Sequence, residues 1–377
     1  MTKLMVETLD NDSTIINMGP QHPSTHGVID LKLRLKGEVI VEADPNVGFL
    51  HRSIEKISEL TPFTGFIPYT DRVDYLSAMF GNQGWCMAIE KLLNIQVPRR
   101  AEYLRVIACE LNRIINHLIA CGTNAMDLGA FTPFLHGIRE REKVNDIMEK
   151  ICGARLNYNY MRFGGVSRDF SPGLDKEILD FINRFEKFVP EFNRLITGNE
   201  IFVKRLIHIG VISPELAISH SLGGPNLRAS GVDFDLRRDF PYSVYPEFKF
   251  NVIVGGNYRG ETGDSFARYM VRIEEMLESA KIIRQAVEGL PEGEHQTKVL
   301  RNPVVPPGEV YSRVESTRGE MGFHVISNGT DCSYRTKIRT GSFTAISIIP
   351  KIAPGLMVAD LTATFGSLDV VAPEIDR

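Results

Sequence analysis

Apolar and polar residues alternate along one early stretch of the chain. Residues 28–42, V-I-D-L-K-L-R-L-K-G-E-V-I-V-E, place an apolar side chain at nearly every second position. This is the period of a strand that is buried on one face only. Lys36 and Gly37 lie between the two alternating runs. The pattern therefore predicts two antiparallel strands joined at this turn.

From about residue 73 the period becomes that of a helix. Between Pro98 and Gly122 apolar residues recur at intervals of three and four, as one stripe: Leu104, Ile107, Ala108, Leu111, Ile114, Ile115 and Leu118. This stripe predicts a long amphipathic helix, preceded by Pro98 and followed by Gly122. Similar patterns, opened or closed by Pro, Gly or Asp, predict helices at about 133–159, 175–197 and 264–288.

The last part of the chain returns to strand patterns. Residues 301–310, R-N-P-V-V-P-P-G-E-V, predict a proline-rich connection, and two alternating runs on either side of Asn328-Gly329 predict a hairpin. The expected fold class is α+β, with a long-helix body and small antiparallel units towards each end. We expect an N-terminal β unit at 1–70, a helical body at 71–300 and a hairpin with a C-terminal segment at 301–377, packed as one compact unit.

Composition narrows the class of protein. The chain has 377 residues, 43% of them hydrophobic, and a formal net charge of -4. Its length allows a large core, and its charge does not favour nucleic acid as a partner. The first residues are acidic where a secretion signal would be basic and then apolar. No apolar run approaches the roughly 20 residues that span a bilayer, so we expect membrane association to go through partners.

Two kinds of cofactor site are not predicted. The five cysteines lie far apart without a C-x-x-C pair, so we expect reduced, mostly buried thiols and no iron-sulfur cluster held by this chain alone. Neither glycine-rich phosphate-binding pattern occurs. The glycine pairs are more simply explained as tight turns or close backbone contacts; they are Gly164-Gly165, Gly223-Gly224 and Gly255-Gly256.

One motif, G-P-Q-H-P-S-T-H-G at residues 19–27, suggests chemistry. His22 and His26 stand four residues apart, but Pro23 and the flanking glycines favour a turn over a helix. A metal site would need more ligands, and none lies close by in sequence. The remaining alternatives are turn histidines bonded to backbone and histidines that pass a proton to a substrate. The residues themselves do not decide between these two.

Five ordered motifs together carry a family resemblance. They are M-G-P-Q-H-P-S-T-H-G, G-F-L-H-R-S-I-E-K, D-R-V-D-Y, A-C-G-T-N-A-M-D-L-G-A and the final D-V-V-A-P-E-I-D-R. With them the chain resembles, over essentially its whole length, the quinone-site subunits in the peripheral arm of respiratory complex I, NADH:quinone oxidoreductase. That family is related to the large subunits of nickel-iron hydrogenases, and the resemblance implies a similar fold.

The hydrogenase relationship also shows what this chain lacks. Those large subunits end in D-P-C-x-x-C-x-x-H, whereas here Val371 and Glu374 stand at the cysteine positions and Arg377 at the histidine position. A nickel-iron centre needs soft thiolate ligands, and valine cannot replace one. Hydrogenase activity is therefore disfavoured, and we expect no metal in this chain.

The resemblance implies roles for three residues. His26 and Tyr75 would hydrogen-bond the two carbonyl oxygens of a quinone head group, and Asp127 would pair with His26. A quinone that accepts two electrons needs two protons, so donors aimed at its two oxygens fit the chemistry. The alternatives are a core aromatic residue for Tyr75 and a helix-end turn residue for Asp127.

Five further positions follow from the same resemblance. His22 would line the quinone pocket, and Val371 and Asp376 correspond to positions where the family pocket meets inhibitors. Arg52 and Arg105 would lie near the iron-sulfur cluster of the neighbouring subunit, where a cation raises the potential of the cluster. For Arg105 an ordinary helix ion pair is the competing interpretation.

The implied assembly is a proton-pumping translocase in a respiratory electron-transport chain. This chain would form the quinone site with an adjacent small subunit that carries a 4Fe-4S cluster. It would also contact other peripheral-arm and membrane-arm subunits, and would lie on the cytoplasmic side of the membrane without crossing it. It would bind no cofactor by itself and would be inactive alone. Two alternatives remain: a related complex that uses ferredoxin or another donor, and a non-catalytic scaffold subunit.

Overall fold

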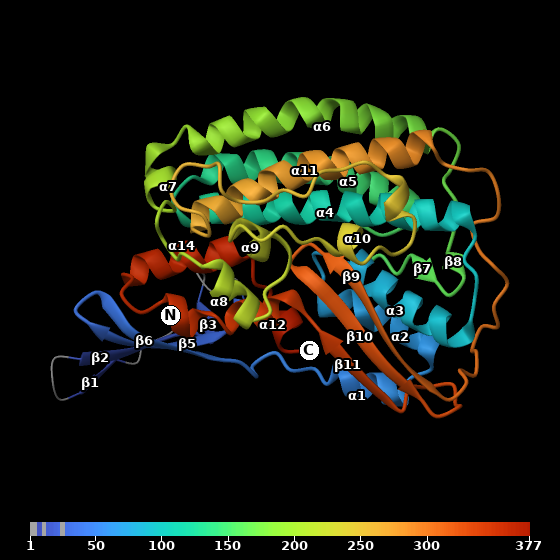
Figure 1. The fold of residues 1–377 in the computed structure, drawn as a ribbon, viewed down its shortest axis with the longest axis horizontal. Coiled ribbons are helices and arrows are strands. Elements are labelled where there is room, and N and C mark those ends of the chain that lie inside the picture. The colour runs from blue at the N-terminus through green and yellow to red at the C-terminus, as the bar shows by residue number, and fades with distance from the viewer. Residues whose placement is uncertain (1–5, 10–12, 23–26) are drawn as a thin grey trace.

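The computed structural model describes residues 6–9, 13–22 and 27–377 and confirms an α+β fold (Figure 1). The long helices lie together in the upper part of Figure 1, and two separate β units lie below them. The helices are α1 (Ile54–Leu60), α2 (Phe63–Val73), α3 (Ala78–Leu93), α4 (Arg99–Asp127), α5 (Phe131–Cys152), α6 (Leu174–Thr197), α7 (Glu200–Lys204), α8 (Pro214–Ser219), α9 (Gly224–Ala229), α10 (Leu236–Asp239), η2 (Tyr245–Glu247), α11 (Ser265–Glu288), α12 (Gly341–Ile346), α13 (Ile349–Ile352), α14 (Val358–Leu368) and α15 (Ala372–Ile375).

The strands form small sheets that are antiparallel throughout. The strands are β1 (Val6–Leu9), β2 (Ser13–Met18), β3 (Gln21–His22), β4 (Gly27–Val28), β5 (Asp30–Lys36), β6 (Val39–Asn46), β7 (Met161–Arg162), β8 (Gly165–Val166), β9 (Gly308–Ser316), β10 (Gly319–Ser327) and β11 (Arg335–Arg339). The larger sheets have the orders β1-β2-β5-β6 and β11-β10-β9. In Figure 1 the first of these sheets lies at the lower left, and the second runs from the centre to the lower right.

Both predicted hairpins are confirmed, with one difference. Strands β5 and β6 pair as the alternation predicted, and β10 pairs with β11. The second connection runs over residues 328–334, longer than the two-residue turn that Asn328-Gly329 suggested. Strands β1, β2 and β9 were not predicted. Strand β9 joins β10 through the two-residue turn Thr317-Arg318.

The predicted long helix exists, but Gly122 does not end it. Helix α4 continues to Asp127, and Gly129, with φ 88°, follows the helix end. A Cβ atom on Gly122 would lie 3.3 Å from the Cα atom of Phe134 in α5. Gly122 is therefore a close-packing position inside the helix, and the prediction that it follows the helix was wrong.

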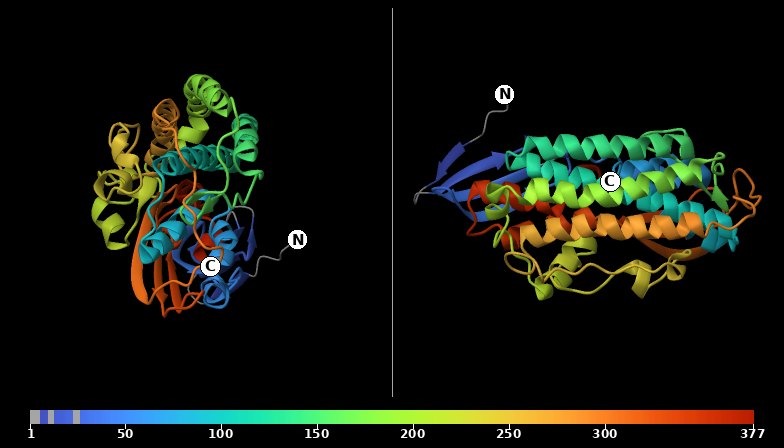
Figure 2. Two further views of the ribbon diagram at one scale, coloured as in Figure 1. Left: turned by 90° about the vertical axis from the view of Figure 1, so that its right-hand side faces the viewer. Right: turned by 90° about the horizontal axis from the view of Figure 1, so that it is seen from above.

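The other helices fall close to their predicted ranges. Helices α5, α6 and α11 lie where the periodicity placed them, although α5 ends at Cys152, before a glycine with φ 83°. Helical structure begins earlier than residue 73, with α1 and α2. Helix α4 packs against α5 and α11 at the centre of the body (Figure 2). The proposed division at residues 70 and 300 stays a prediction.

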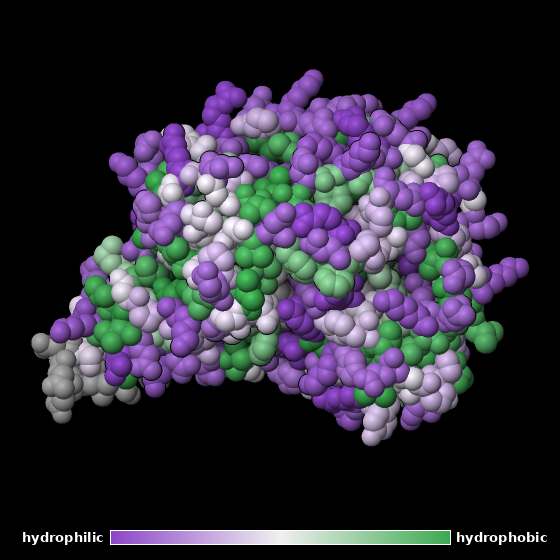
Figure 3. All heavy atoms as spheres, viewed as in Figure 1, coloured by the Kyte–Doolittle hydropathy of each residue, from purple (hydrophilic) through white to green (hydrophobic). Residues whose placement is uncertain are grey.

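The C-terminal segment lies inside the molecule. Helix α14 packs against α4 and α11, and α15 packs against α12 and α2. Among the described residues, no helix is both long and apolar enough to cross a bilayer. On the face drawn in Figure 3, hydrophilic residues predominate and hydrophobic ones are exposed in scattered areas. All five cysteines are free thiols, and three of them are buried.

Candidate functional site

A cavity of about 260 Å³ lies where three distant segments meet. Its walls come from the loop between α2 and α3, from the second half of α4, and from the segment that follows α14. The lining residues are Tyr75, Leu76, Ile119, Thr123, Met126, Asp127, Asp369, Val370 and Val371. Three residues that the resemblance singled out, Tyr75, Asp127 and Val371, therefore share one cavity.

The α4 wall follows from helical geometry. Ile119, Thr123, Met126 and Asp127 stand at spacings of four, three and one, so they present one face of the helix over its last turns. Thr123 Oγ1 donates to the carbonyl oxygen of Ile119 at 2.9 Å. The Thr123 hydroxyl thus has its hydrogen-bond acceptor within the helix. Asp127 is the charged residue that α4 contributes to the cavity lining.

The loop that carries Tyr75 is held in shape by its neighbours. Asp74 Oδ1 accepts hydrogen bonds from the backbone N–H groups of Leu76 at 3.1 Å and Ser77 at 3.3 Å. Asn112 of α4 donates to the carbonyl oxygen of Leu76 at 2.8 Å. These bonds fix the loop against α4 just before α3 begins.

Tyr75 stands at the mouth of the cavity. Its side chain is 37% exposed, so the cavity opens to the protein surface beside it. Burial raises the pKa of the Tyr75 phenol above its ordinary value, the Arg318 guanidinium opposes this effect, and Asp74 and Asp369 add to it. The phenol therefore keeps its proton at neutral pH and is available as a hydrogen-bond donor.

Asp127 approaches α14 at a glycine. A Cβ atom on Gly366 would lie 3.2 Å from Asn124 Oδ1 and 3.4 Å from Asp127 Oδ2. A larger residue at position 366 would have to displace these polar groups of α4. Gly366 thus allows α4 and α14 to converge at the cavity.

Val371 is fixed by a buried hydrogen-bond chain. Its backbone N–H donates to Ser342 Oγ at 3.1 Å, and Ser342 in turn donates to the carboxylate of Glu374. Glu374 is fully buried and also accepts from the backbone N–H of Gly341 at 3.2 Å. Burial, with Asp74 next in effect, raises the pKa of Glu374 to about 7.

The histidine motif, residues 19–27, is described only at residues 19–22 and 27. His26 lies outside the described residues, and for His22 only the backbone is described, in strand β3, where it pairs with Gly27. A Cβ atom on Gly27 would lie 2.7 Å from Cβ of Ala372. The residue that follows His26 therefore touches the residue that follows Val371. The roles of His22 and His26 stay predictions.

Asp376 and Arg52 lie along the C-terminal segment and are not among the lining residues. Asp376 Oδ2 accepts from the backbone N–H of Leu50 at 2.7 Å, and Oδ1 lies 3.6 Å from Nδ1 of His51. Arg52 Nη2 donates to the carbonyl oxygens of Arg72 at 2.9 Å and Pro373 at 3.2 Å. Both side chains thus hold residues 50–52 against the chain end.

Arg105 is placed far from the cavity. It lies 22 residues before Asp127 on α4, which corresponds to about 33 Å along a helix. Its guanidinium is fully buried and pairs with Glu90 at 2.5 and 3.0 Å. Burial lowers its pKa, but Glu90 and then Glu102 more than compensate and hold it above the ordinary value. This geometry favours the ion-pair interpretation, and a role near a partner's cluster stays a prediction.

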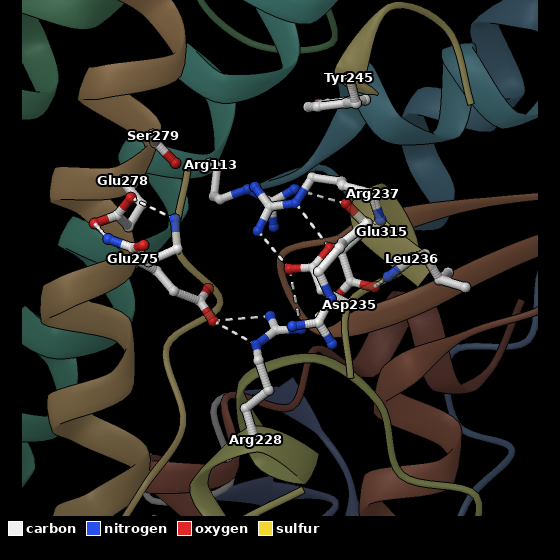
Figure 4. A network of polar contacts seen from close by, with 12 residues as sticks. Arg113, Arg228, Asp235, Leu236, Arg237, Tyr245, Glu275, Glu278, Ser279 and Glu315 are labelled. Atoms are coloured by element: carbon white, nitrogen blue, oxygen red, sulfur yellow. Dashed lines mark hydrogen bonds and ion pairs between the residues drawn. The ribbon is translucent and has the colours of Figure 1, made fainter. Parts of the chain in front are cut away.

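A buried ionic network lies in the helical body and was not predicted from the sequence (Figure 4). Arg228 pairs with Glu275 and Glu315, both at 2.8 Å, and Arg237 pairs with Asp235 at 2.7 Å. The network joins α4, α9, α10, α11 and β9. Buried arginines paired in this way fix element positions, and no pattern along the sequence reveals them because the partners are distant in sequence.

A second cavity lies elsewhere. It has a volume of about 460 Å³ and is bordered by η2, the segments around it and α11, with Tyr245, Phe250 and Lys281 among its lining residues. None of the singled-out residues whose side chains the structure describes lines it. Within the described ranges, no group of three or more His, Cys, Asp or Glu side chains is placed to hold a metal ion.

Comparison with known proteins identifies the family. Residues 127–304 and 294–377 match the family described as "Respiratory-chain NADH dehydrogenase, 49 Kd subunit". Over 379 residues the chain is 58% identical to a D-type NADH-quinone oxidoreductase subunit of Anaeromyxobacter dehalogenans, with all of both chains covered. It is 53% identical to a subunit of the same type from Sorangium cellulosum, covering 97% of this chain and 95% of that one. It is 47% identical to the one from Bacillus cytotoxicus, covering 97% and 99%. The chain therefore belongs to the 49 kDa subunit family of respiratory-chain NADH dehydrogenase and is a subunit of NADH-quinone oxidoreductase.

Proposed function

We propose that the cavity lined by Tyr75, Asp127 and Val371 holds the head group of a quinone during its reduction. The observation that carries the proposal is the meeting of these three residues, which are far apart in sequence, around one cavity. They offer a phenol, a carboxylate and an apolar wall, a combination that suits a flat ring with polar oxygens.

The chemistry of the walls fits quinone reduction. Two electrons and two protons convert the two carbonyl groups of a quinone into hydroxyl groups. The Tyr75 phenol, protonated at neutral pH, donates a hydrogen bond to one oxygen. His26 donates to the other, and Asp127 pairs with His26 and holds its proton towards the ring. The contact between Gly27 and Ala372 supports this arrangement, because Gly27 directly follows His26 and Ala372 directly follows Val371.

The size of the cavity supports a quinone site that is shared with a neighbouring subunit. At about 260 Å³ it lies just below the usual range for ligand pockets, and Tyr75 leaves it open at the surface. A neighbouring subunit with a 4Fe-4S cluster would close the opening and supply electrons. Arg52 is half-buried, and its guanidinium donates to the carbonyl oxygen of Pro373 in the C-terminal segment. We place this cation nearest to the cluster of the neighbouring subunit.

The wider assembly is part of the same proposal. The electrons would come from NADH through other peripheral-arm subunits, and the quinone tail would reach the membrane through membrane-arm subunits. Quinone reduction would be coupled to proton translocation. The chain would lie against the cytoplasmic side of the membrane and would be inactive alone. The competing function is a scaffold subunit, for which the cavity residues would matter only through assembly.

We test the function with Tyr75→Phe in native membranes. The change removes one hydroxyl group and leaves the ring, so we expect NADH:quinone reduction to fall roughly 100-fold, the lower end of the range for loss of one positioned proton donor. Reduction of an artificial hydrophilic acceptor by NADH and the amount of assembled complex are expected to stay at wild-type levels.

The controls separate the two functions. Tyr69→Phe changes another partly exposed tyrosine, one that does not line the cavity, and should leave all three measurements unchanged. Wild-type quinone reduction in the Tyr75 variant would contradict the proposal and favour the scaffold function.

A further inference from the structure

The turn between β9 and β10 points into the protein. Its second residue, Arg318, is only 1% exposed, which is unusual for arginine. Glycines make room for the turn: a Cβ atom on Gly224 would lie 2.5 Å from the backbone nitrogen of Gly319, and one on Gly341 would lie 2.2 Å from the carbonyl oxygen of Arg318. The backbone around Arg318 is therefore held on two sides.

Arg318 binds all three segments that form the cavity walls. Its Nη1 donates to Asp74 Oδ2 at 2.5 Å, and Asp74 immediately precedes Tyr75. Its Nε donates to the carbonyl oxygen of Asp369 at 2.7 Å, and its Nη2 lies 3.2 Å from Asp369 Oδ1. The same Nη2 donates to Asn116 of α4 at 2.7 Å. One planar guanidinium thus joins the Tyr75 loop, the Asp369–Val371 segment and α4.

We propose that Arg318 is a positioning residue for quinone reduction, which sets the Tyr75 phenol against the opposite wall of the cavity. This inference rests on the proposed function and adds a residue to it. Arg318 does not line the cavity, so it acts through Asp74 and Asp369. Its removal would leave the buried Asp74 carboxylate without its cation and Asp369 with only the more distant Arg272, at 3.9 Å, and would free the walls to separate.

Electrostatics support the same assignment. The charged groups that act on the Tyr75 phenol are Arg318, Asp74 and Asp369, and Arg318 alone lowers the pKa of the phenol. Asn116 donates to Asp369 Oδ2 at 3.0 Å, which fixes the second carboxylate as well. The positive charge thus offsets two negative charges next to the proposed proton donor.

A purely structural arginine offers a matched control. Arg228 is equally buried and pairs with Glu275 and Glu315 (Figure 4). None of these three residues lines the cavity. A role limited to stability would make Arg318 and Arg228 equivalent, whereas a positioning role would affect quinone kinetics at Arg318 only.

The test compares Arg318→Lys with Arg228→Lys in the assembled complex, with a short-chain ubiquinone as acceptor. Lysine keeps the charge but cannot span three partners, so we expect kcat to fall roughly 10-fold and the quinone KM to rise about threefold. Activity per assembled complex with the hydrophilic acceptor should be unchanged. Arg228→Lys is expected to lower only the amount of complex. Asp74→Asn, a milder change, should move kcat and KM in the same direction as Arg318→Lys.

A Tyr75→Phe background shows whether Arg318 acts through Tyr75. We expect Arg318→Lys to change the residual quinone activity by less than about twofold there, because coupled residues are not additive. If Tyr75→Phe lowers quinone reduction but Arg318→Lys and Asp74→Asn leave the KM and kcat of the assembled complex unchanged, the positioning inference is overturned alone. Equal losses with both acceptors would also overturn it. Unchanged activity in Tyr75→Phe would instead overturn the proposed function.

Discussion

Tryptophan in place of Val371 is expected to reduce NADH:quinone activity of the assembled complex to less than about one-hundredth of wild type. Val371 is 5% exposed and lines a cavity of about 260 Å³. An indole at this position would occupy the space that we assign to the quinone ring, and a 1 Å displacement of a reactant can already cost a factor of roughly 100. NADH oxidation with a hydrophilic acceptor should continue.

The matched control at this position is Val371→Ile. It adds only one methylene group, which costs typically about 1–3 kcal/mol in a well-packed site, so quinone reduction should persist with a raised KM. Equal quinone activity in the tryptophan and isoleucine variants, with normal assembly, would show that the ring does not bind beside Val371.

Alanine in place of Gly341 is expected to lower the amount of assembled complex several-fold. A Cβ atom there would lie 2.2 Å from the carbonyl oxygen of Arg318, and backbone cannot move aside as a side-chain end can. Overpacking of this kind costs about 1–3 kcal/mol and occasionally more, out of a total stability of roughly 5–15 kcal/mol. The amount of complex in native gels and its midpoint of thermal unfolding measure the effect.

Gly308→Ala provides the control for that variant. Its added Cβ atom would meet only the flexible end of Leu92, at 3.2 Å, so the amount of complex should stay near wild type. If Gly341→Ala accumulated as well as Gly308→Ala, the close contact at Arg318 would not be essential to the fold.

Local patterns were sufficient to predict the elements that depend on local contacts. The alternation at residues 28–42 predicted the β5–β6 hairpin, and the apolar stripe predicted α4. Gly122 was misread because glycine often marks a helix end, whereas here its missing side chain admits Phe134 of a neighbouring helix. Only the packing of α4 against α5 distinguishes a glycine that ends a helix from a glycine that allows two helices to pack closely.

The cavity could be predicted only in part. Tyr75, Asp127 and Val371 came from a family resemblance, since nothing in their spacing brings them together. Asp369 stood within the C-terminal motif and could have been singled out as a charged residue two positions before Val371.

Arg318 carried no signal in the sequence, because its role depends on partners 244 and 51 residues away. Contacts at such separations depend on the tertiary fold, which single-sequence periodicity does not encode.

Photoaffinity labelling of the assembled complex with a photoreactive short-chain quinone tests the central claim most directly. We predict cross-links to this chain within residues 75–76, 119–127 and 369–371, suppressed by excess unmodified quinone and lost in Val371→Trp. Cross-links confined to the larger cavity around Tyr245 and Lys281, or to other subunits only, would show that the quinone does not bind beside Tyr75 and Val371.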